Sequence, residues 1–327
     1  MSTPGKATVT PETLKVTPDN FARAETDWYF AQFAARGELG TFYHYRSLPP
    51  IDLPAVRLNR DTLYSQILLD LDAGPVTLTL PNPGKRYMSL AIIDENHYAR
   101  DLIYQPGEHT FTRNDVGTRY MFAAVRTLVD PADPKDLDHV HGLQDALEMK
   151  QPGGPGRFET PNWDETSRKK VKAALQSLGD TIPDLKRAFG PRDRVDPIRH
   201  LIGTATGWGG NPDEDAIYLN ITPEANDGTG VYKLTVKEVP VDGFWSISVY
   251  DAQGHFVKNK FDSYTLNNIT AKHGVDGSVT VQFGACDGGA GNCLPIFPGW
   301  NYMVRLYRPR KEILDGTWRF PETVRVS

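Results

Sequence analysis

Hydrophobic and polar positions alternate with a period of two in two separate stretches of this chain. In the first stretch, Leu78 and Leu80 alternate with Thr77 and Thr79, which is typical of a strand that buries one face. Turn signals at residues 72–74 and 81–84 bound this segment. The first stretch as a whole predicts strands at residues 62–71, 75–80, 87–94, 99–104, 107–112 and 119–128.

The second strand-rich stretch begins near residue 211. Within residues 244–250, Trp245, Ile247 and Val249 fall on one face, while the two serines and the tyrosine between and after them fall on the other. Turn dipeptides at 242–243 and 276–277 separate the predicted strands. These strands cover residues 216–221, 231–236, 244–250, 279–283 and 302–307.

Helical signals precede and separate the two stretches. A hydroxyl cap at Thr17 followed by a proline predicts a helix that runs to about residue 36, with Phe21, Trp28 and Ala35 on one face. Asn162, three residues before Glu165, resembles a capping box for a helix that continues to residue 178. Further helical pieces are predicted at residues 137–150, 183–189 and 197–203.

Together these elements predict a mainly β protein, α+β overall, with two sandwich-like domains and a helical connector. The length of 327 residues fits two domains of ordinary size. The expected division is an arm and helix at 1–37, a first β-sandwich at 38–133, the helical connector at 134–205 and a second, jelly-roll-like domain at 206–327.

Composition and charge narrow the class of protein. The net charge is -5 and no block of lysine and arginine occurs, so nothing indicates a nucleic-acid partner or an anionic membrane surface. No run of about 20 apolar residues is present to span a bilayer, and the N-terminus lacks the pattern of a signal peptide. A soluble, cytoplasmic protein is therefore expected.

Two cysteines, Cys286 and Cys293, flank a glycine-rich loop. The glycines would let the loop close a disulfide, whereas a reducing compartment argues against one, so the sequence leaves the bridge open. Two cysteines alone do not make a zinc site.

The densest polar run is residues 57–65, RLNRDTLYS, at the start of the first strand. Packing does not require so many ionisable side chains, so they either satisfy one another or face a ligand. On a strand, one side would carry Arg57, Asn59, Asp61 and Ser65, and the other Arg60, Thr62 and Tyr64.

Two interpretations of this run remain open. In the structural one, arginine, aspartate and amide side chains fix the entrance of the strand. In the functional one, Arg57 or Arg60 binds a carboxylate or carbonyl group and Asp61 or Tyr64 transfers a proton. Ser65 as a nucleophile is the most specific version, although no local motif supplies its base.

Other residues are candidates for the same pocket. Lys258 and Asn259 are expected on one rim of a cleft between the domains, opposite Arg60 and Tyr64. The loop at Trp208 is a candidate for the lining. We also expect ligand contacts from two further residues, Arg86 and Trp245.

Eight histidines allow for a metal, but no H-E-x-x-H or comparable pattern is present. His44, His97 and His109 lie in or near predicted strand ends and could converge. Scattered, hydrogen-bonded histidines are the alternative, and we expect neither a metal nor a cofactor.

Several multi-residue motifs resemble a pair of bacterial families. Residues 57–65, 71–75 and 86–87 resemble domain of unknown function 1254. Residues 244–251, 276–278, 303–309 and 314–318 resemble its usual C-terminal partner, domain of unknown function 1214. The resemblance implies a β-sandwich followed by a jelly-roll sandwich of the peptide-amidating monooxygenase and glycan-amidase type, and it implies no general activity. This chain has Cys293 where the family commonly has tryptophan, which favours the disulfide.

The resulting prediction is a homo-oligomeric enzyme, most simply a hydrolase of a small carbonyl-bearing or aromatic compound, with its pocket between the domains. The alternative is a non-catalytic module that binds a glycan or a protein. A metal-dependent oxygenase is the third hypothesis, and it rests on the jelly-roll analogy alone.

Overall fold

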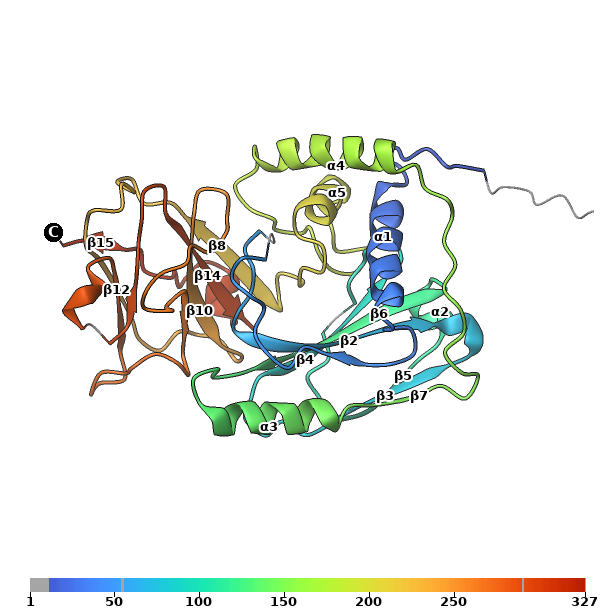
Figure 1. The fold of residues 1–327 in the computed structure, drawn as a ribbon, viewed down its shortest axis with the longest axis horizontal. Helices are drawn as coiled ribbons and strands as arrows, with labels where there is room; N and C mark the ends of the chain where they lie inside the picture. Colours follow the sequence, from blue (N-terminus) through green and yellow to red (C-terminus); the bar gives the residue numbers. More distant parts are fainter. Residues whose placement is uncertain (1–11, 54–55, 101, 290, 327) are drawn as a thin grey trace, which may run out of the picture.

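The computed structural model describes residues 12–53, 56–100, 102–289 and 291–326. Its N-terminal half contains two antiparallel sheets that pack face to face (Figure 1). The first has the order β1-β2-β6-β4, formed by Tyr43–His44, Thr62–Asp70, Tyr120–Leu128 and Met88–Asp94. The second has the order β5-β3-β7, formed by Gly107–Phe111, Val76–Leu80 and Glu148–Lys150.

The alternation of apolar residues explains why these two sheets face each other. Leu78 and Leu80 of β3 join one hydrophobic cluster with Ile67, Leu90 and Val125 of the other sheet. The central pair, β2 and β6, is antiparallel from Thr62 opposite Leu128 to Asp70 opposite Tyr120.

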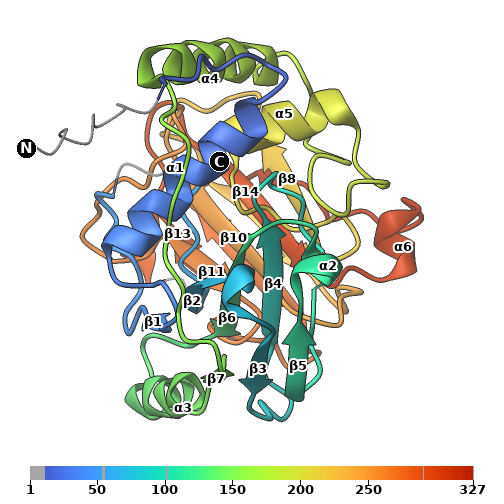
Figure 2. The same cartoon turned by 90° about the vertical axis from the view of Figure 1, so that its right-hand side faces the viewer.

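Helices cover the other face of the first sheet (Figures 1 and 2). Helix α1, Phe21–Ala35, places Phe30 and Phe33 against Phe122 of β6. Two further helices, α4 at Glu165–Gly179 and α5 at Pro197–Thr206, pack on the side of α1 that faces away from the sheet.

Because α1 packs against the sheet on one side and against α4 and α5 on another, its buried residues differ from those predicted. Phe21 is buried as predicted, but Trp28 is 37% exposed and Ala35 is also exposed. The prediction of a single face through these three residues was therefore wrong. The helix buries Phe30 and Phe33 toward the sheet instead.

Four other local predictions need correction, the first being the helical piece at residues 183–189, which forms turns and bends instead. The cap of α4 is Asp164, whose carboxylate accepts from the Ser167 N–H at 2.8 Å, and not Asn162. Residues 99–104, of which residue 101 lies outside the described part, form two isolated bridges on β4 instead of a strand. The helix predicted at 137–150 is α3, Pro134–Asp145, and the chain then becomes strand β7.

The C-terminal half also contains two sheets. One has the order β11-β10-β14-β8, formed by Thr265–Asn267, Trp245–Tyr250, Asn301–Tyr307 and Ala216–Ile221. The other has the order β13-β12-β9-β15, formed by Cys293–Leu294, Val279–Phe283, Tyr232–Val236 and Val324–Arg325. The pair β12 and β13 is parallel, and the other neighbouring strands of these two sheets are antiparallel.

Trp245, Ile247 and Val249 face the core between these two sheets, as their alternation predicted. The opposite face of β10 therefore turns Ser248 and Tyr250 toward the N-terminal half. The described residues thus form a mainly β protein of the α+β class with no closed barrel, which confirms the predicted fold class. Four short helical segments complete it: η1 Leu71–Ala73, α2 Arg113–Val116, η2 Cys286–Gly288 and α6 Lys311–Leu314.

The segment expected as a connector, residues 134–205, is integrated with the N-terminal half. Strand β7 pairs with β3, and α4 and α5 pack against α1. In the part of the chain that the structure describes, no helix is both long enough and apolar enough to cross a membrane.

Cys286 and Cys293 form the disulfide that the sequence left open. It lies across the loop between β12 and β13, and both residues are nearly buried. Disulfides are uncommon in reducing compartments, and the cytoplasmic location stays a prediction.

Replacing both cysteines by serine is expected to lower the free energy of unfolding by about 2 kcal/mol, because the short loop regains its freedom in the unfolded chain. Urea denaturation measures the loss. Wild-type protein unfolded in the presence of a reductant should match the variant, and equal stability of all three samples would contradict the prediction.

Candidate functional site

The polar run at residues 57–65 lies where the two halves meet, against the outer face of the β11-β10-β14-β8 sheet. The Tyr250 hydroxyl on β10 donates to the Leu58 carbonyl at 2.8 Å. Arg305 on β14 donates to the Arg57 carbonyl at 2.8 Å and to the Ser248 hydroxyl at 2.9 Å. The backbone at the start of the run is thus held by the C-terminal sheet.

The Arg57 side chain takes part in the same contact. Its Nη1 donates to Asn301 Oδ1 at 2.7 Å, and its guanidinium lies 5.4 Å from the centre of the Tyr250 ring. Burial lowers the pKa of Arg57. The geometry gives Arg57 a role in joining the halves.

Asp61 is fully buried at this contact. Its Oδ1 accepts from Asn267 Nδ2 at 3.1 Å and from the Thr265 hydroxyl at 3.3 Å. Its Oδ2 has no hydrogen-bond partner among the described residues. The aspartate therefore anchors the start of β2 to β11.

Tyr64 belongs to a separate cluster, formed with Asn59, Arg126 and Tyr307. Asn59 Nδ2 donates to the Tyr64 hydroxyl at 3.0 Å and to the Tyr307 hydroxyl at 3.4 Å. Burial acts to raise the pKa of Tyr64, but the charge of Arg126 and the hydrogen bonds that the phenol oxygen accepts outweigh it, so this pKa is lowered.

Arg126 was not among the sequence candidates. Its Nη1 donates to Asn211 Oδ1 at 2.7 Å and its Nη2 to the Gly209 carbonyl at 2.8 Å. The signal that could have found it is a lone charged residue in the strand YMFAAVRTL, since a charge in such an apolar segment needs specific partners.

Strand pairing places a possible base, which no local sequence motif had indicated, beside Ser65. Strand β1 places His44 directly opposite Ser65, and His44 Nδ1 lies 2.8 Å from the serine Oγ. Burial lowers the pKa of His44, and the nearby Arg46 adds to this effect. Ser65 is only 1% exposed, so the geometry supports a structural hydrogen bond more than attack on a substrate.

A surface hollow of about 470 Å³ lies between the segment before β2 and the segment after β10. Arg60 from the polar run and Lys258 from the second half both line it, in the arrangement that we expected of a cleft between the domains. The remaining lining residues are Leu48, Pro50, Ile51, Asp52, Phe256, Asp262 and Tyr264.

The hollow has a charged and an apolar part. The Arg60 guanidinium lies 5.8 Å from the centre of the Tyr264 ring and donates to the Pro49 carbonyl. Burial lowers the pKa of Arg60, while Asp262 acts to raise it. Lys258 is exposed and has no ion pair with any described residue. Two cations thus lie beside an aromatic wall, together with the carboxylates of Asp52 and Asp262.

The other sequence candidates lie outside the residues that line this hollow. Arg86 pairs with Asp136 of α3 and donates to the Leu128 carbonyl. Asn259 donates to the Ser263 carbonyl at 2.9 Å and thereby shapes the loop. Trp208 stacks on Tyr29 at 4.4 Å over α1, and Trp245 belongs to the C-terminal core.

The three histidines that could have converged do not. His44 contacts Ser65, His97 is buried against Thr204 of α5, and His109 contacts the Gln105 carbonyl. Among the described residues, no group of three or more histidine, cysteine, aspartate and glutamate side chains is placed to hold a metal ion.

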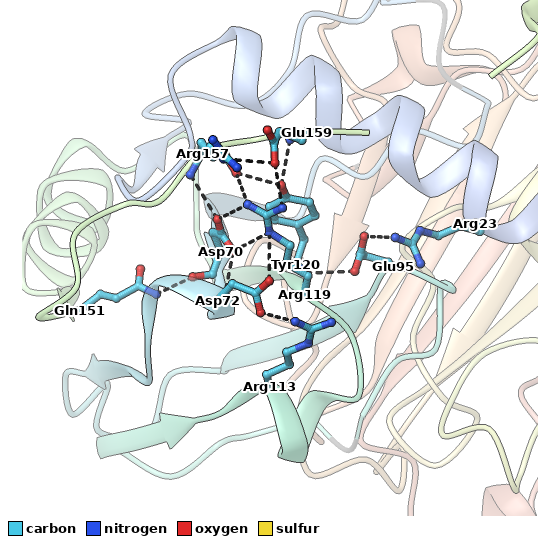
Figure 3. Close-up of polar contacts among 10 residues, drawn as sticks. All are labelled: Arg23, Asp70, Asp72, Glu95, Arg113, Arg119, Tyr120, Gln151, Arg157 and Glu159. Atoms are coloured by element: carbon cyan, nitrogen blue, oxygen red, sulfur yellow. Dashed lines mark hydrogen bonds and ion pairs between the residues drawn. The ribbon is translucent and has the colours of Figure 1, made fainter. Parts of the chain in front are cut away.

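A second set of charged residues lies at the far end of β2, away from the hollow (Figure 3). Arg119 donates to both carboxylate oxygens of Asp70, at 3.0 and 2.8 Å, and pairs with Glu159 at 3.0 Å. Burial acts to raise the pKa of Asp70, but these hydrogen bonds outweigh it and lower the pKa. Each carboxylate has an arginine partner, so the cluster fixes the segment around residue 157 to the sheet.

Comparison with known proteins supports the fold without naming an activity. Residues 39–99 match the family model of DUF1254 and residues 216–311 that of DUF1214, each described as a protein of unknown function. The order is the one that the resemblance implied, so this prediction is confirmed. A search of curated proteins found no match.

Two solved structures share the fold. The VPA0106 protein from Vibrio parahaemolyticus has a TM-score of 0.73 and 18% identity, over 95% of this chain and 98% of that one. An uncharacterized protein from Burkholderia cenocepacia has a TM-score of 0.53 and 12% identity, over 94% of this chain and 86% of that one. At such identities the likeness concerns the fold alone.

Proposed function

We propose that this chain, which matches two families described as proteins of unknown function, binds a small organic carboxylate or carbonyl compound in the hollow at Arg60 and Lys258. The observation that carries the proposal is the meeting of these two cations, from opposite halves of the chain, in one hollow of about 470 Å³.

The lining suits a ligand with one polar end. Arginine recognises a carboxylate or carbonyl oxygen through charge-assisted hydrogen bonds, and Lys258 supplies a second positive charge. Ile51, Phe256 and Tyr264 offer apolar surface to the rest of the ligand. A volume of this size falls within the usual range for small-molecule sites.

Hydrolysis of such a compound stays a prediction. Asp61, Tyr64 and Ser65, which we expected to perform it, are not among the residues that line the hollow. A hydrolase working there would use the carboxylate of Asp262 or Asp52 as its general base toward water.

Replacing Lys258 or Arg60 by methionine is expected to weaken the binding of aromatic and aliphatic carboxylates at least about tenfold, because each loses a charge-assisted hydrogen bond worth about 1.5 kcal/mol or more. The matching neutral amides should bind both variants nearly as they bind the wild type. Calorimetric titration with a panel of acids, amides, esters and sugars measures this.

The matched control is Lys260→Met. Lys260 lies two residues from Lys258, is exposed, and pairs with Asp287 away from the hollow. Unchanged carboxylate affinity in the Arg60 and Lys258 variants would refute the proposal, and binding of sugars alone would favour the glycan-binding alternative. Ester turnover lost in Ser65→Ala but kept in Asp262→Asn would place the chemistry elsewhere.

A further inference from the structure

We propose that a second site, separate from the hollow, lies between β6 and the outer face of the C-terminal sheet and binds a small monovalent anion at Arg126 and Asn211. The anion is of the size of chloride or formate. The proposal is independent of the function proposed above.

The first observation is a buried positive charge without a negative partner. Arg126 is 8% exposed, and within the described residues no carboxylate lies at ion-pair distance from it. Its two terminal nitrogens donate to the neutral oxygens of Asn211 and Gly209, and its guanidinium also hydrogen-bonds to the Tyr64 phenol. A buried guanidinium that finds only neutral acceptors is costly, and an added negative charge removes most of that cost.

The second observation is a buried donor without an acceptor. Asn211 is 1% exposed, and its Oδ1 already accepts from Arg126. Its Nδ2 has no hydrogen-bond partner in the part of the chain that the structure describes. A buried amide of this kind requires a bound water or ion, and because it adjoins Arg126 a single anion would serve both groups.

Two neighbouring phenols do not supply the missing negative charge. Burial raises the pKa of Tyr218 and of Tyr307, so both keep their protons at neutral pH. Both lie in the same cluster, since the charge of Arg126 acts to lower the pKa of Tyr218 and the Tyr307 hydroxyl accepts from Asn59 Nδ2 at 3.4 Å. The groups around Arg126 are therefore neutral phenols and amides, which leave its charge without a counterion.

An ionised Tyr64 is the alternative source of negative charge. The Tyr64 oxygen already accepts from Asn59 Nδ2 at 3.0 Å, and the charge of Arg126 lowers its pKa against the effect of burial. A tyrosinate would balance Arg126, but it would leave Asn211 Nδ2 without an acceptor. An external anion accounts for both observations, and the burial of Arg126 and Asn211 restricts it to a small one.

The first test measures thermal unfolding at constant ionic strength while chloride replaces gluconate, which is too large for the site. We expect the melting temperature of the wild type to rise with the logarithm of chloride concentration, since the ligand binds the folded state. Asn211→Asp supplies its own negative charge beside Arg126, so its melting temperature should not respond to chloride. Asn220→Asp, on an exposed position of β8, is the matched control and should respond as the wild type does.

The second test does not depend on any variant. Crystals of the wild type grown with bromide should show an anomalous peak within hydrogen-bond reach of Arg126 and Asn211. An ordered water at that position, or absorbance near 295 nm that reveals one tyrosinate at neutral pH and disappears in Tyr64→Phe, would overturn the proposal. So would a melting temperature that is independent of chloride.

Discussion

Replacing Arg168 by methionine is expected to lower the free energy of unfolding by about 3 kcal/mol or more. Arg168 on α4 is 4% exposed and pairs with Glu25 of α1, which is fully buried. Its guanidinium also lies 4.7 Å from the centre of the Trp28 ring. Removing it leaves the Glu25 carboxylate in the interior with Lys172 as its remaining partner, at 2.7 Å.

Urea denaturation of single and double variants separates charge from packing. Glu25→Leu combined with Arg168→Met removes both charges, so it should be more stable than Arg168→Met alone by at least about 1 kcal/mol. Lys169→Met is the control, because Lys169 is exposed on the same helix and its pair with Glu165 should contribute within about 0.5 kcal/mol. A double variant less stable than the single one would refute this reasoning.

The second large effect is a pH dependence that comes from His97. This imidazole is 2% exposed, contacts the Thr204 hydroxyl through Nδ1 at 2.8 Å, and accepts from the Gly209 N–H through Nε2 at 2.9 Å. Protonation of Nε2 would break the second bond. Burial, followed by the charge of His200, holds the pKa of His97 well below its usual value.

The sign follows from proton binding. Below its ordinary pKa of about 6.5, His97 is protonated in the unfolded chain but stays neutral in the folded one. The unfolded state therefore binds more protons, and stability falls as the pH falls. The contribution of one such histidine is about 1.4 kcal/mol per pH unit, until the pH reaches the lowered pKa of the folded state.

Comparing the wild type with His97→Gln isolates this contribution. Asp94 contributes to the pH dependence of stability with the opposite sign, because burial raises its pKa to about 6. This contribution is present in both proteins and cancels in their difference. As the pH falls from 6 to 5, the stability of the variant relative to the wild type should rise by about 1.2 kcal/mol, because the unfolded histidine is already mostly protonated at pH 6. Urea denaturation at several pH values measures this, and parallel stability curves would show that His97 does not titrate as argued.

The sequence by itself determined most of the longer strands and the faces of two of them. The period-two alternation in residues 75–80 and 244–250 predicted β3 and β10, and it also predicted which side of β10 meets the C-terminal core. Local patterns suffice here because the alternation of a strand is fixed by its backbone geometry. The paired families could likewise be identified from short motifs.

The hydrophobic pattern alone did not predict the buried face of a helix that packs against two other layers. Helix α1 carries Trp28 on a face that an amphipathic pattern would bury, yet the side chain is exposed, because sheet and helices cover α1 from two directions. Asp164 and Asn162 are both good caps by composition. The sequence alone could not choose between them.

The residues of the candidate sites could also be predicted only in part. The sequence identified Arg60 and Lys258 as residues that could face each other across a cleft, and they line one hollow. It could not find the partners of the polar run, because His44 reaches Ser65 only through strand pairing, and Arg126 reaches Asn211 across 85 residues of chain.

Local sequence patterns therefore determined most of the longer strands and helices and which residues are unusually polar. The tertiary structure decided which of those polar residues form hydrogen bonds with one another and which line the surface hollow. The reason is physical: a hydrogen bond or an ion pair depends on the distance between atoms that can be far apart in the sequence, whereas the period of a strand depends only on neighbouring residues.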